Sequence, residues 1–377
     1  MKLLSLILVL LLILPVPVSA LELSAKSAIL MDVATGTVLY EENPHERLSP
    51  ASVTKIMTML LILEAVDAGQ IRLTDTVTAS ETAAAKGGSQ VYLKVGETMS
   101  VSDMLKSIAV SSANDCACAM AEHLAGSESA FVEKMNRRAE ELGMNDTHFV
   151  NCTGLDDSPE AETHKTSAHD IALMSRQLLK YHPKIKEFTT IWMDTIRNGT
   201  FGLSNTNKLV RFYPGATGLK TGYTSRAGYC LSAAAERDDL ELIAVVMGSR
   251  TSGERNEACK QLLDLGFSQY ALIEPDLTEA DTTVPVKLGK QPCTTARLGG
   301  STELLIEKEK SRTVTTQIDL PGSLTAPIAQ GQQVGTLTIS SGEEILAKVP
   351  LVSAAEVPRL TWLQIFTRIL RQCAMGK

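Results

Sequence analysis

The sequence predicts an α+β unit, followed by a small all-β module and a terminal amphipathic helix. Apolar residues first alternate as in a strand pair, then recur with helical spacing, and then return to strands before one more helix. Near residue 273 the sequence pattern changes to short Val, Thr and Leu runs that are interrupted by Pro and Gly, which is typical of a small β module. The length of 377 residues also favours more than one domain, since a domain usually holds about 100–200 residues.

The composition limits the class of protein. With 44% hydrophobic and 21% charged residues, the chain has enough apolar material for packed cores, which excludes a disordered or collagen-like protein. The formal net charge is −7 and the pI is near 5.5. No global positive field is therefore available to attract nucleic acid, and we expect no nucleic-acid partner.

The first twenty residues have the layout of a secretory signal peptide. Lys2 precedes an apolar run over residues 3–14, and small residues end the segment at Val18-Ser19-Ala20. The alternative is an uncleaved anchor, but the run is too short to span about 30 Å of hydrocarbon. We therefore expect residues 1–20 to be removed after Ala20 and the mature protein to act outside the cytoplasm.

The first folded unit is expected to span residues 21–272. It begins with a predicted hairpin that pairs 27–33 with 37–41 around Ala34-Thr35-Gly36. Helical patterns follow at 52–67, 101–111, 115–124, 128–142 and 167–181, and strand patterns at 217–224, 228–236 and 240–247 precede a helix at 254–265. In an α+β arrangement of this kind, the beginning and the end of the unit share one sheet.

The β module is expected at 273–356 and the last segment at 357–377. Helical spacing between Arg359 and Met375 creates an apolar stripe that faces away from Arg368 and Arg371; its members are Trp362, Phe366, Ile369, Leu370 and Cys373. Such a helix either lies in a membrane interface or docks on its own protein. Its terminal position and local basicity favour the membrane, so we expect contact with the outer face of the cytoplasmic membrane.

Seven cysteines are scattered along the chain without a Cys-x-x-Cys pair or a neighbouring histidine at ligand spacing. Neither a disulfide framework nor a zinc site is indicated. We expect small buried side chains with free thiols.

The first chemical signal is Ser52-Val53-Thr54-Lys55 at the start of a predicted helix. Residues three apart on a helix share a face, so the serine hydroxyl and the lysine ammonium lie close together. The helix N-terminus also favours negative charge that develops nearby. Alone the pair is weak evidence, because Ser-x-x-Lys occurs by chance about once in a chain of this length.

Two further triplets strengthen the signal. Ser112-Ala113-Asn114 falls at a predicted junction between helices, and Lys220-Thr221-Gly222 falls on a predicted strand. Together with Ser52 and Lys55, in this order, they form the motif set of penicillin-binding proteins and class A β-lactamases.

The chain resembles the low-molecular-mass penicillin-binding D-alanyl-D-alanine carboxypeptidases over nearly all of its expected mature length. The likeness extends to the segments AILMDVATGTVLY (28–40), SPASVTKIMTM (49–59), SAND (112–115), LGMNDTHF (142–149), NTNKL (205–209), GLKTGYTSRAGY (218–229), MGSR (247–250) and APIAQGQQV (326–334). The resemblance implies a penicillin-binding/β-lactamase-like transpeptidase domain, in which an antiparallel sheet carries a helical subdomain. It implies no metal and no cofactor. The implied partners are D-Ala-D-Ala stem peptides of peptidoglycan and β-lactam antibiotics.

The resemblance also implies roles for the motif residues. Ser52 is expected to attack the carbonyl between two D-alanines, and Lys55 to act as its base if burial and the like charge of Lys220 lower its pKa. Ser112 is expected to relay a proton to the leaving amine, and Asn114 to hold the substrate amide and the Lys55 amine.

On the strand side, the implied task is to hold the end of the peptide. Lys220 and Thr221 are expected to meet the terminal carboxylate, with Arg250 as a further candidate. Gly222 allows the backbone to approach the substrate closely. The backbone N–H groups of Ser52 and Tyr223 are expected to form the oxyanion hole.

Three nearby residues have a structural interpretation. His164 and Asp170 are expected to cap and orient a helix; a role in catalysis is the alternative. Cys116 is expected to pack in the interior, and would be reactive only if it were exposed.

Two rival functions share the motifs. A secreted β-lactamase would carry the same triplets, but residues 140–145 do not form the Glu-x-x-Leu-Asn arrangement of class A enzymes, and the β module is foreign to them. An inactive surface protein that only binds wall peptides would gain nothing from an activated serine. We therefore favour a carboxypeptidase.

Overall fold

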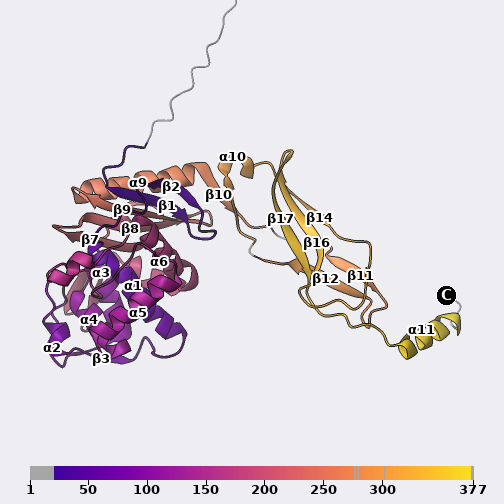
Figure 1. The fold of residues 1–377 in the computed structure, drawn as a ribbon, viewed down its shortest axis with the longest axis horizontal. Coiled ribbons are helices and arrows are strands. Elements are labelled where there is room, and N and C mark those ends of the chain that lie inside the picture. Colours follow the sequence, from indigo (N-terminus) through magenta and orange to yellow (C-terminus); the bar gives the residue numbers. More distant parts are fainter. Residues whose placement is uncertain (1–20, 276, 278–279, 301, 375–377) are drawn as a thin grey trace, which may run out of the picture.

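The computed structural model describes residues 21–275, 277, 280–300 and 302–374, so the predicted signal peptide lies outside the described residues. Figure 1 shows a large α+β unit at one end, a slender β unit beside it, and a terminal helix that projects from the far side of the β unit. The predicted fold class is confirmed.

The large unit is built on a five-stranded antiparallel sheet with the strand order β2-β1-β9-β8-β7. Its strands are β1 (Ser27–Asp32), β2 (Val38–Glu42), β7 (Ala216–Thr224), β8 (Gly228–Arg237) and β9 (Leu240–Ser249). Strand β1 pairs directly with β9, for example Leu30 with Ala244, so the two ends of the unit share one sheet as expected. Strand β7 is one of the two edge strands, which leaves one side of the Lys220–Gly222 triplet without a neighbouring strand in this sheet.

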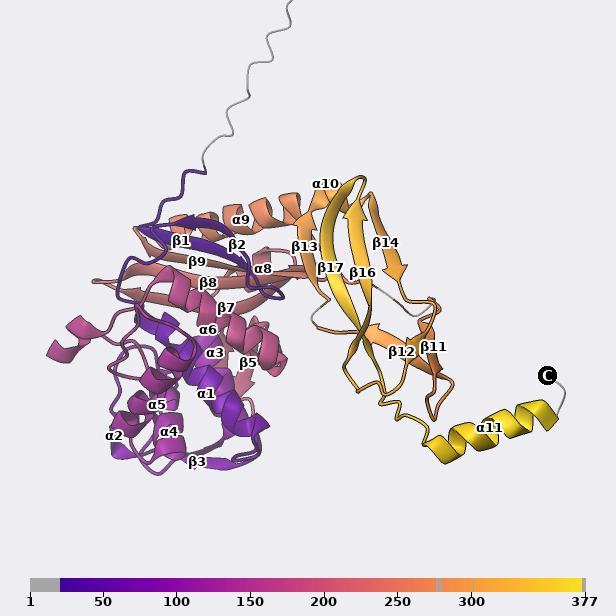
Figure 2. The ribbon, with the colours of Figure 1, turned by 45° about the vertical axis from the view of Figure 1, so that its right-hand side comes forward.

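Helices cover both faces of this sheet (Figure 2). The larger group consists of α1 (Lys55–Asp67), α3 (Val101–Ser111), α4 (Asn114–Ala125), α5 (Glu128–Glu141) and α6 (Ala168–Tyr181). Helix α1 is apolar on nearly every side and runs through the middle of this group, where most of its side chains are buried. Helix α9 (Ser252–Gln269) packs on the opposite face, against a second core that includes Leu231 and Leu242.

Several short elements were not predicted. They are η1 (Ala51–Thr54), β3 (Thr76–Thr78), α2 (Glu81–Ala84), β4 (Thr98–Ser100), η2 (Pro159–Thr163), η3 (Pro183–Ile185), α7 (Lys186–Thr189), β5 (Met193–Ile196), β6 (Phe201–Ser204), α8 (Leu209–Phe212) and α10 (Lys308–Ser311). The 3-10 helix η1 corrects one expectation, because Ser52 lies in η1 and not in the first turn of α1.

The β unit has its own small core, which includes Leu337 and Leu351. Its strands are β10 (Tyr270–Ile273), β11 (Thr283–Lys287), β12 (Cys293–Leu298), β13 (Leu304–Glu307), β14 (Val314–Asp319), β15 (Leu324–Thr325), β16 (Gln333–Ser341) and β17 (Glu344–Ser353). Six of them form a sheet in the order β14-β16-β17-β12-β11-β15. Strand β10 follows α9 directly and pairs with β13, so a two-stranded ribbon connects the units.

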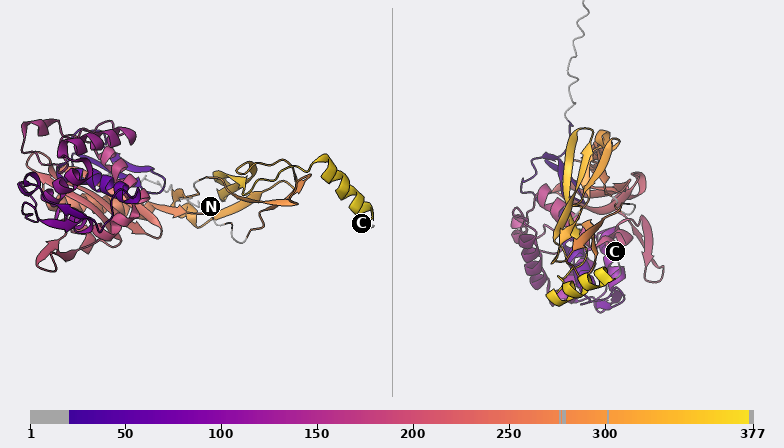
Figure 3. Two further views of the ribbon diagram at one scale, coloured as in Figure 1. Left: turned by 90° about the horizontal axis from the view of Figure 1, so that it is seen from below. Right: turned by 90° about the vertical axis from the view of Figure 1, so that its right-hand side faces the viewer.

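The terminal helix α11 spans Trp362–Ala374, slightly less than the predicted range. The large unit, the β unit and α11 follow one another along the length of the molecule (Figure 3). Among the described residues, no helix is both long and apolar enough to cross a membrane.

Candidate active site

Ser52 lies in η1, which is held between strand β7 and a turn at residues 151–154. A Cβ atom on Gly222 would stand 2.7 Å from the Pro50 carbonyl oxygen and 3.1 Å from the Ser52 nitrogen. A Cβ atom on Gly154 would overlap the Ala51 carbonyl oxygen, at 1.8 Å. Both glycines therefore allow backbone to pack directly against the backbone that carries Ser52.

Lys55 is completely buried and points back at Ser52. Its Nζ lies 2.9 Å from Ser52 Oγ and donates a hydrogen bond to the Thr153 carbonyl oxygen at 2.7 Å. Burial lowers the pKa of Lys55 to about 7, although Cys152 and Asp115 act in the opposite direction. A substantial fraction of this amine is therefore neutral near pH 7, and a neutral amine can accept the proton of a serine hydroxyl.

The carbonyl that receives Lys55 belongs to a tightly held turn. Asn151 Oδ1 accepts hydrogen bonds from the backbone N–H groups of Thr153 and Gly154 and from the Thr153 hydroxyl, at 2.7–3.1 Å. Sequence reasoning missed this turn. The only signal for it was an asparagine three residues before a glycine, Asn151-Cys-Thr-Gly154, which is a common turn composition.

Ser112 and Asn114 lie where α3 meets α4. Ser112 ends α3 in the left-handed region, with φ 62°, and is almost fully buried. The Asn114 side-chain Nδ2 donates to the Gly87 carbonyl oxygen at 2.8 Å. Asn114 Oδ1 is buried and has no partner within the described part of the chain, which makes it an acceptor that lacks a donor.

The triplet on β7 supplies a second buried lysine. Lys220 Nζ donates to the Thr221 carbonyl oxygen at 2.9 Å, and the Thr221 hydroxyl pairs with the Thr206 hydroxyl at 2.7 Å. Burial, followed by the positive charges of Lys55 and Arg255, holds the pKa of Lys220 well below its usual range. The charge of Lys220 was expected to lower the pKa of Lys55, but it is not among the main causes of that shift, of which burial is the largest.

Two further predicted residues, Tyr223 and Arg250, are exposed. Tyr223 follows the triplet, is 54% exposed, and stacks on Tyr229 with ring centroids 4.2 Å apart. Arg250 follows the end of β9, and its side chain is 81% exposed. Within the described part of the chain, the polar contacts of Arg250 are all with Glu254, including an ion pair at 3.1 Å, so the structure does not bring Arg250 together with Lys220 and Thr221.

His164 supports η1 through a hydrogen bond to Thr54. Val150 N–H donates to His164 Nδ1 at 3.2 Å, which places the ring proton on Nε2, 2.9 Å from Thr54 Oγ1; that hydroxyl in turn donates to the Ala51 carbonyl oxygen. Burial, and then the charges of His148 and Lys165, lower the pKa of His164 to about 4. A neutral histidine that supports η1 agrees with the structural interpretation.

Asp170 and the cysteines also behave as structural residues. The Asp170 carboxylate is buried and accepts hydrogen bonds from Asp146 N–H and the Thr147 hydroxyl at the start of α6. All seven cysteines are free; five are buried, whereas Cys293 and Cys373 are exposed. Cys116 is among the buried ones, and burial raises its pKa well above the usual range, so the condition for reactivity is not met.

The comparisons with known proteins agree with this geometry. Residues 15–251 match the D-alanyl-D-alanine carboxypeptidase family, and residues 267–359 match the penicillin-binding protein 5 C-terminal domain. The chain is 44% identical over 359 residues to D-alanyl-D-alanine carboxypeptidase DacF of Bacillus subtilis (strain 168), covering 93% of this chain and 90% of that protein.

Solved structures show the same relationship. Penicillin-binding protein 5 from Haemophilus influenzae aligns with a TM-score of 0.74 and 30% identity, over 90% of this chain and 98% of that chain. Penicillin-binding protein D2 from Listeria monocytogenes, solved in an ampicillin-bound form, aligns with a TM-score of 0.60 and 33% identity, over 66% of this chain and 99% of that chain.

The fold and the paired serine and lysine define a serine-type peptidase of the penicillin-binding class. Within that class, the chain belongs to the low-molecular-mass D-alanyl-D-alanine carboxypeptidase family, which acts in the bacterial cell wall.

Proposed function

We propose that Ser52 carries out the family's reaction by attacking the carbonyl between the last two D-alanines of a peptidoglycan stem peptide. Lys55 accepts the Ser52 proton as the new ester bond forms. The C–N bond then breaks, and the terminal D-alanine leaves after its amine receives a proton through Ser112. Water hydrolyses the ester and regenerates Ser52.

The 2.9 Å approach of the buried Lys55 Nζ to the partly buried Ser52 Oγ carries this proposal. A serine hydroxyl is a weak nucleophile at neutral pH, so it needs a base within hydrogen-bond reach. Lys55 meets both requirements, since its distance is correct and its pKa is lowered to about 7.

The remaining residues bind the substrate in this scheme. The unpartnered Asn114 Oδ1 supports a contact with a substrate N–H group. Lys220 and Thr221 receive the terminal carboxylate. Arg250 contributes only if its guanidinium leaves Glu254.

The backbone of β7 completes the scheme. Gly222 lies against η1 and keeps side-chain atoms out of the space between the two segments. The N–H groups of Ser52 and Tyr223 stabilise the oxyanion.

Free D-alanine released from a peptide that ends in D-Ala-D-Ala tests this function. The wild-type protein should release it, Ser52→Ala should not, and Ser268→Ala, which changes an exposed serine on α9, should match the wild type. Release by Ser52→Ala at the wild-type rate would refute the nucleophile. Rapid turnover of penicillin, without a persistent adduct, would favour the β-lactamase alternative.

We also propose that residues 1–20 are a cleaved signal peptide and that α11 associates with the outer face of the cytoplasmic membrane. Trp362, Leu363, Phe366, Ile369 and Leu370 are exposed on a helix that projects from the β unit (Figure 1). An apolar stripe with arginines on the other side suits a membrane interface. In this arrangement, 21–272 is the catalytic domain and 273–356 is a spacer between it and the membrane segment at 357–377.

A further inference from the structure

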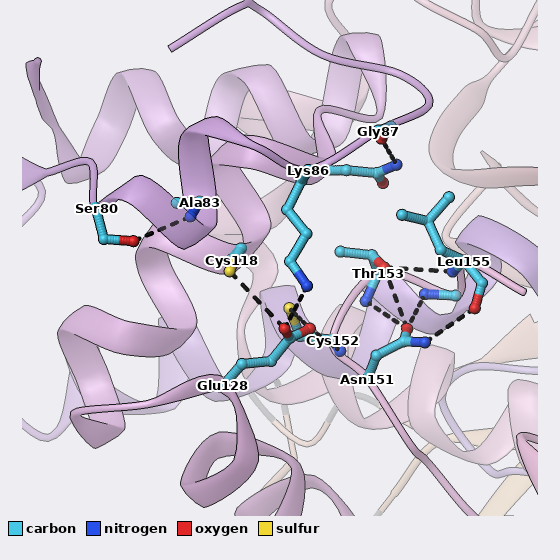
Figure 4. Close-up of polar contacts among 12 residues, drawn as sticks. Ser80, Ala83, Lys86, Gly87, Cys118, Glu128, Asn151, Cys152, Thr153 and Leu155 are labelled. Atoms are coloured by element: carbon cyan, nitrogen blue, oxygen red, sulfur yellow. Dashed lines mark hydrogen bonds and ion pairs between the residues drawn. The ribbon is translucent and has the colours of Figure 1, made fainter. Parts of the chain in front are cut away.

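A partly buried ion pair, Lys86–Glu128, lies beside the turn that receives Lys55. Figure 4 shows the side chains of Lys86, Cys118 and Cys152 converging on the carboxylate of Glu128, with Asn151 and Thr153 next to them. Lys86 Nζ lies 2.5 Å from Glu128 Oε2, and both side chains are mostly buried. The pair lines a cavity of about 350 Å³ together with Asn151, Thr153 and Leu155.

Glu128 is linked to the catalytic lysine through the backbone of Cys152 and Thr153. Its Oε1 accepts hydrogen bonds from the Cys152 N–H and thiol, each at 3.2 Å. The Cys152 carbonyl oxygen accepts a hydrogen bond from the Thr58 hydroxyl at 2.7 Å, and the carbonyl that follows it, that of Thr153, accepts the hydrogen bond from Lys55 Nζ. Asn151 holds the other side of the same turn, so the direction of the Thr153 carbonyl depends on Asn151 and Glu128 together with Thr58.

Lys86 belongs to the loop that contacts Asn114, as Glu128 contacts the turn that binds Lys55. The carbonyl of its neighbour Gly87 accepts the hydrogen bond from Asn114 Nδ2, and the carbonyl of Ser89 accepts one from Asn114 N–H at 2.7 Å. A Cβ atom on Gly88 would stand 2.7 Å from Asn114 Nδ2, so this loop packs closely on the Asn114 amide.

We propose that the Lys86–Glu128 pair is a positioning element, which fixes the two backbone carbonyls that aim Lys55 and Asn114 at the substrate. The pair links the loop that carries Gly87 to the turn that carries Thr153. Neither residue touches the substrate in this scheme. The inference rests on the proposed role of Lys55.

Glu128→Gln and Lys86→Met separate positioning from simple support of the fold. The readout is the rate constant for acylation by a fluorescent penicillin, expressed per titratable active site and measured across pH. Small misplacements at a reacting centre cost up to about 100-fold in rate, so we expect a fall of about 10- to 100-fold for Glu128→Gln. Lys86→Arg, which keeps the cation, should stay within about threefold of the wild type.

The pH profile gives the second readout. Glu128→Gln leaves the positive charge of Lys86 uncompensated and loosens the Thr153 carbonyl, which favours the charged form of the Lys55 amine. The acid limb of the plot of acylation rate against pH should therefore move to lower pH. Lys86→Met leaves the Glu128 charge uncompensated, so its acid limb should move to higher pH. A loss of folded protein lowers the active fraction and moves neither limb.

The controls make each outcome decisive. Glu133→Gln, at an exposed position on the same helix, should match the wild type. If Glu128→Gln does not fold, Lys86→Met decides, because it keeps the contacts between Glu128 and Cys152. Rate constants within about twofold of the wild type, or a fall with both acid limbs unmoved, would overturn the proposal. Lys55→Arg measured in parallel separates this failure from a failure of the proposed function, since normal acylation by that variant refutes the base itself.

Discussion

Replacing Gly222 by alanine tests whether the close approach of β7 to η1 sets the geometry of Ser52. The new Cβ atom would stand 2.7 Å from the Pro50 carbonyl oxygen and 3.1 Å from the Ser52 nitrogen. Both neighbours are backbone atoms, so no side-chain rotation relieves the contact. Ordinary contact begins near 3.4 Å, and η1 and β7 must therefore separate by about 0.7 Å.

A displacement of that size bears directly on the reaction. A 1 Å misplacement costs about 100-fold in rate, so we expect acylation of Gly222→Ala by a fluorescent penicillin to slow by about 10- to 100-fold. Stopped-flow fluorescence measures this rate, and a thermal melt confirms the fold. Gly202→Ala is the matched control, because a Cβ atom there meets nothing within 4 Å. Acylation of Gly222→Ala at the rate of Gly202→Ala would refute the reasoning.

Three other perturbations have defined outcomes. The acylation rate of the wild-type protein should rise with pH through about 7, because only the neutral form of Lys55 accepts a proton; a profile that is flat from about pH 5.5 to about pH 8.5 would contradict this. His164 has its pKa lowered from 6.5 to about 4, so the unfolded state binds more protons between these values, and about 3 kcal/mol of the free energy of unfolding should be lost as pH falls through this window. Urea denaturation of His164→Gln should lack that loss, and an unchanged pH slope would show that His164 is not its source. Truncation after Pro358 should release the protein from membrane vesicles with D-alanine release intact, whereas retained vesicle binding would locate the membrane contact elsewhere.

The sequence predicted the elements that have long, regular patterns. Strands β7, β8 and β9 and helix α3 lie within a residue or two of their predicted ranges, because each buries a continuous face. The shared sheet followed from the order of the elements. Short pieces such as η1 and the β5–β6 pair contain too few residues for a periodic signal, and tertiary contacts decide their conformation.

The sequence predicted that Ser52 and Lys55 lie close together, but it did not predict the backbone groups that hold them. The Ser-x-x-Lys spacing predicted the contact between the Lys55 amine and the Ser52 hydroxyl, because residues three apart on a helix lie on the same face. The Thr153 carbonyl was invisible in the sequence, because a backbone acceptor carries no residue identity. Arg250 was predicted to bind the substrate carboxylate, but Glu254, four residues further on in the first turn of α9, pairs with it.

The most direct test of the central claim is to locate the covalent adduct. The protein would be incubated with penicillin, digested, and mapped by mass spectrometry. The account predicts one penicilloyl group on the peptide that contains Ser52, and none in Ser52→Ala. A stoichiometric adduct on Ser112, or on any residue other than Ser52, would contradict it.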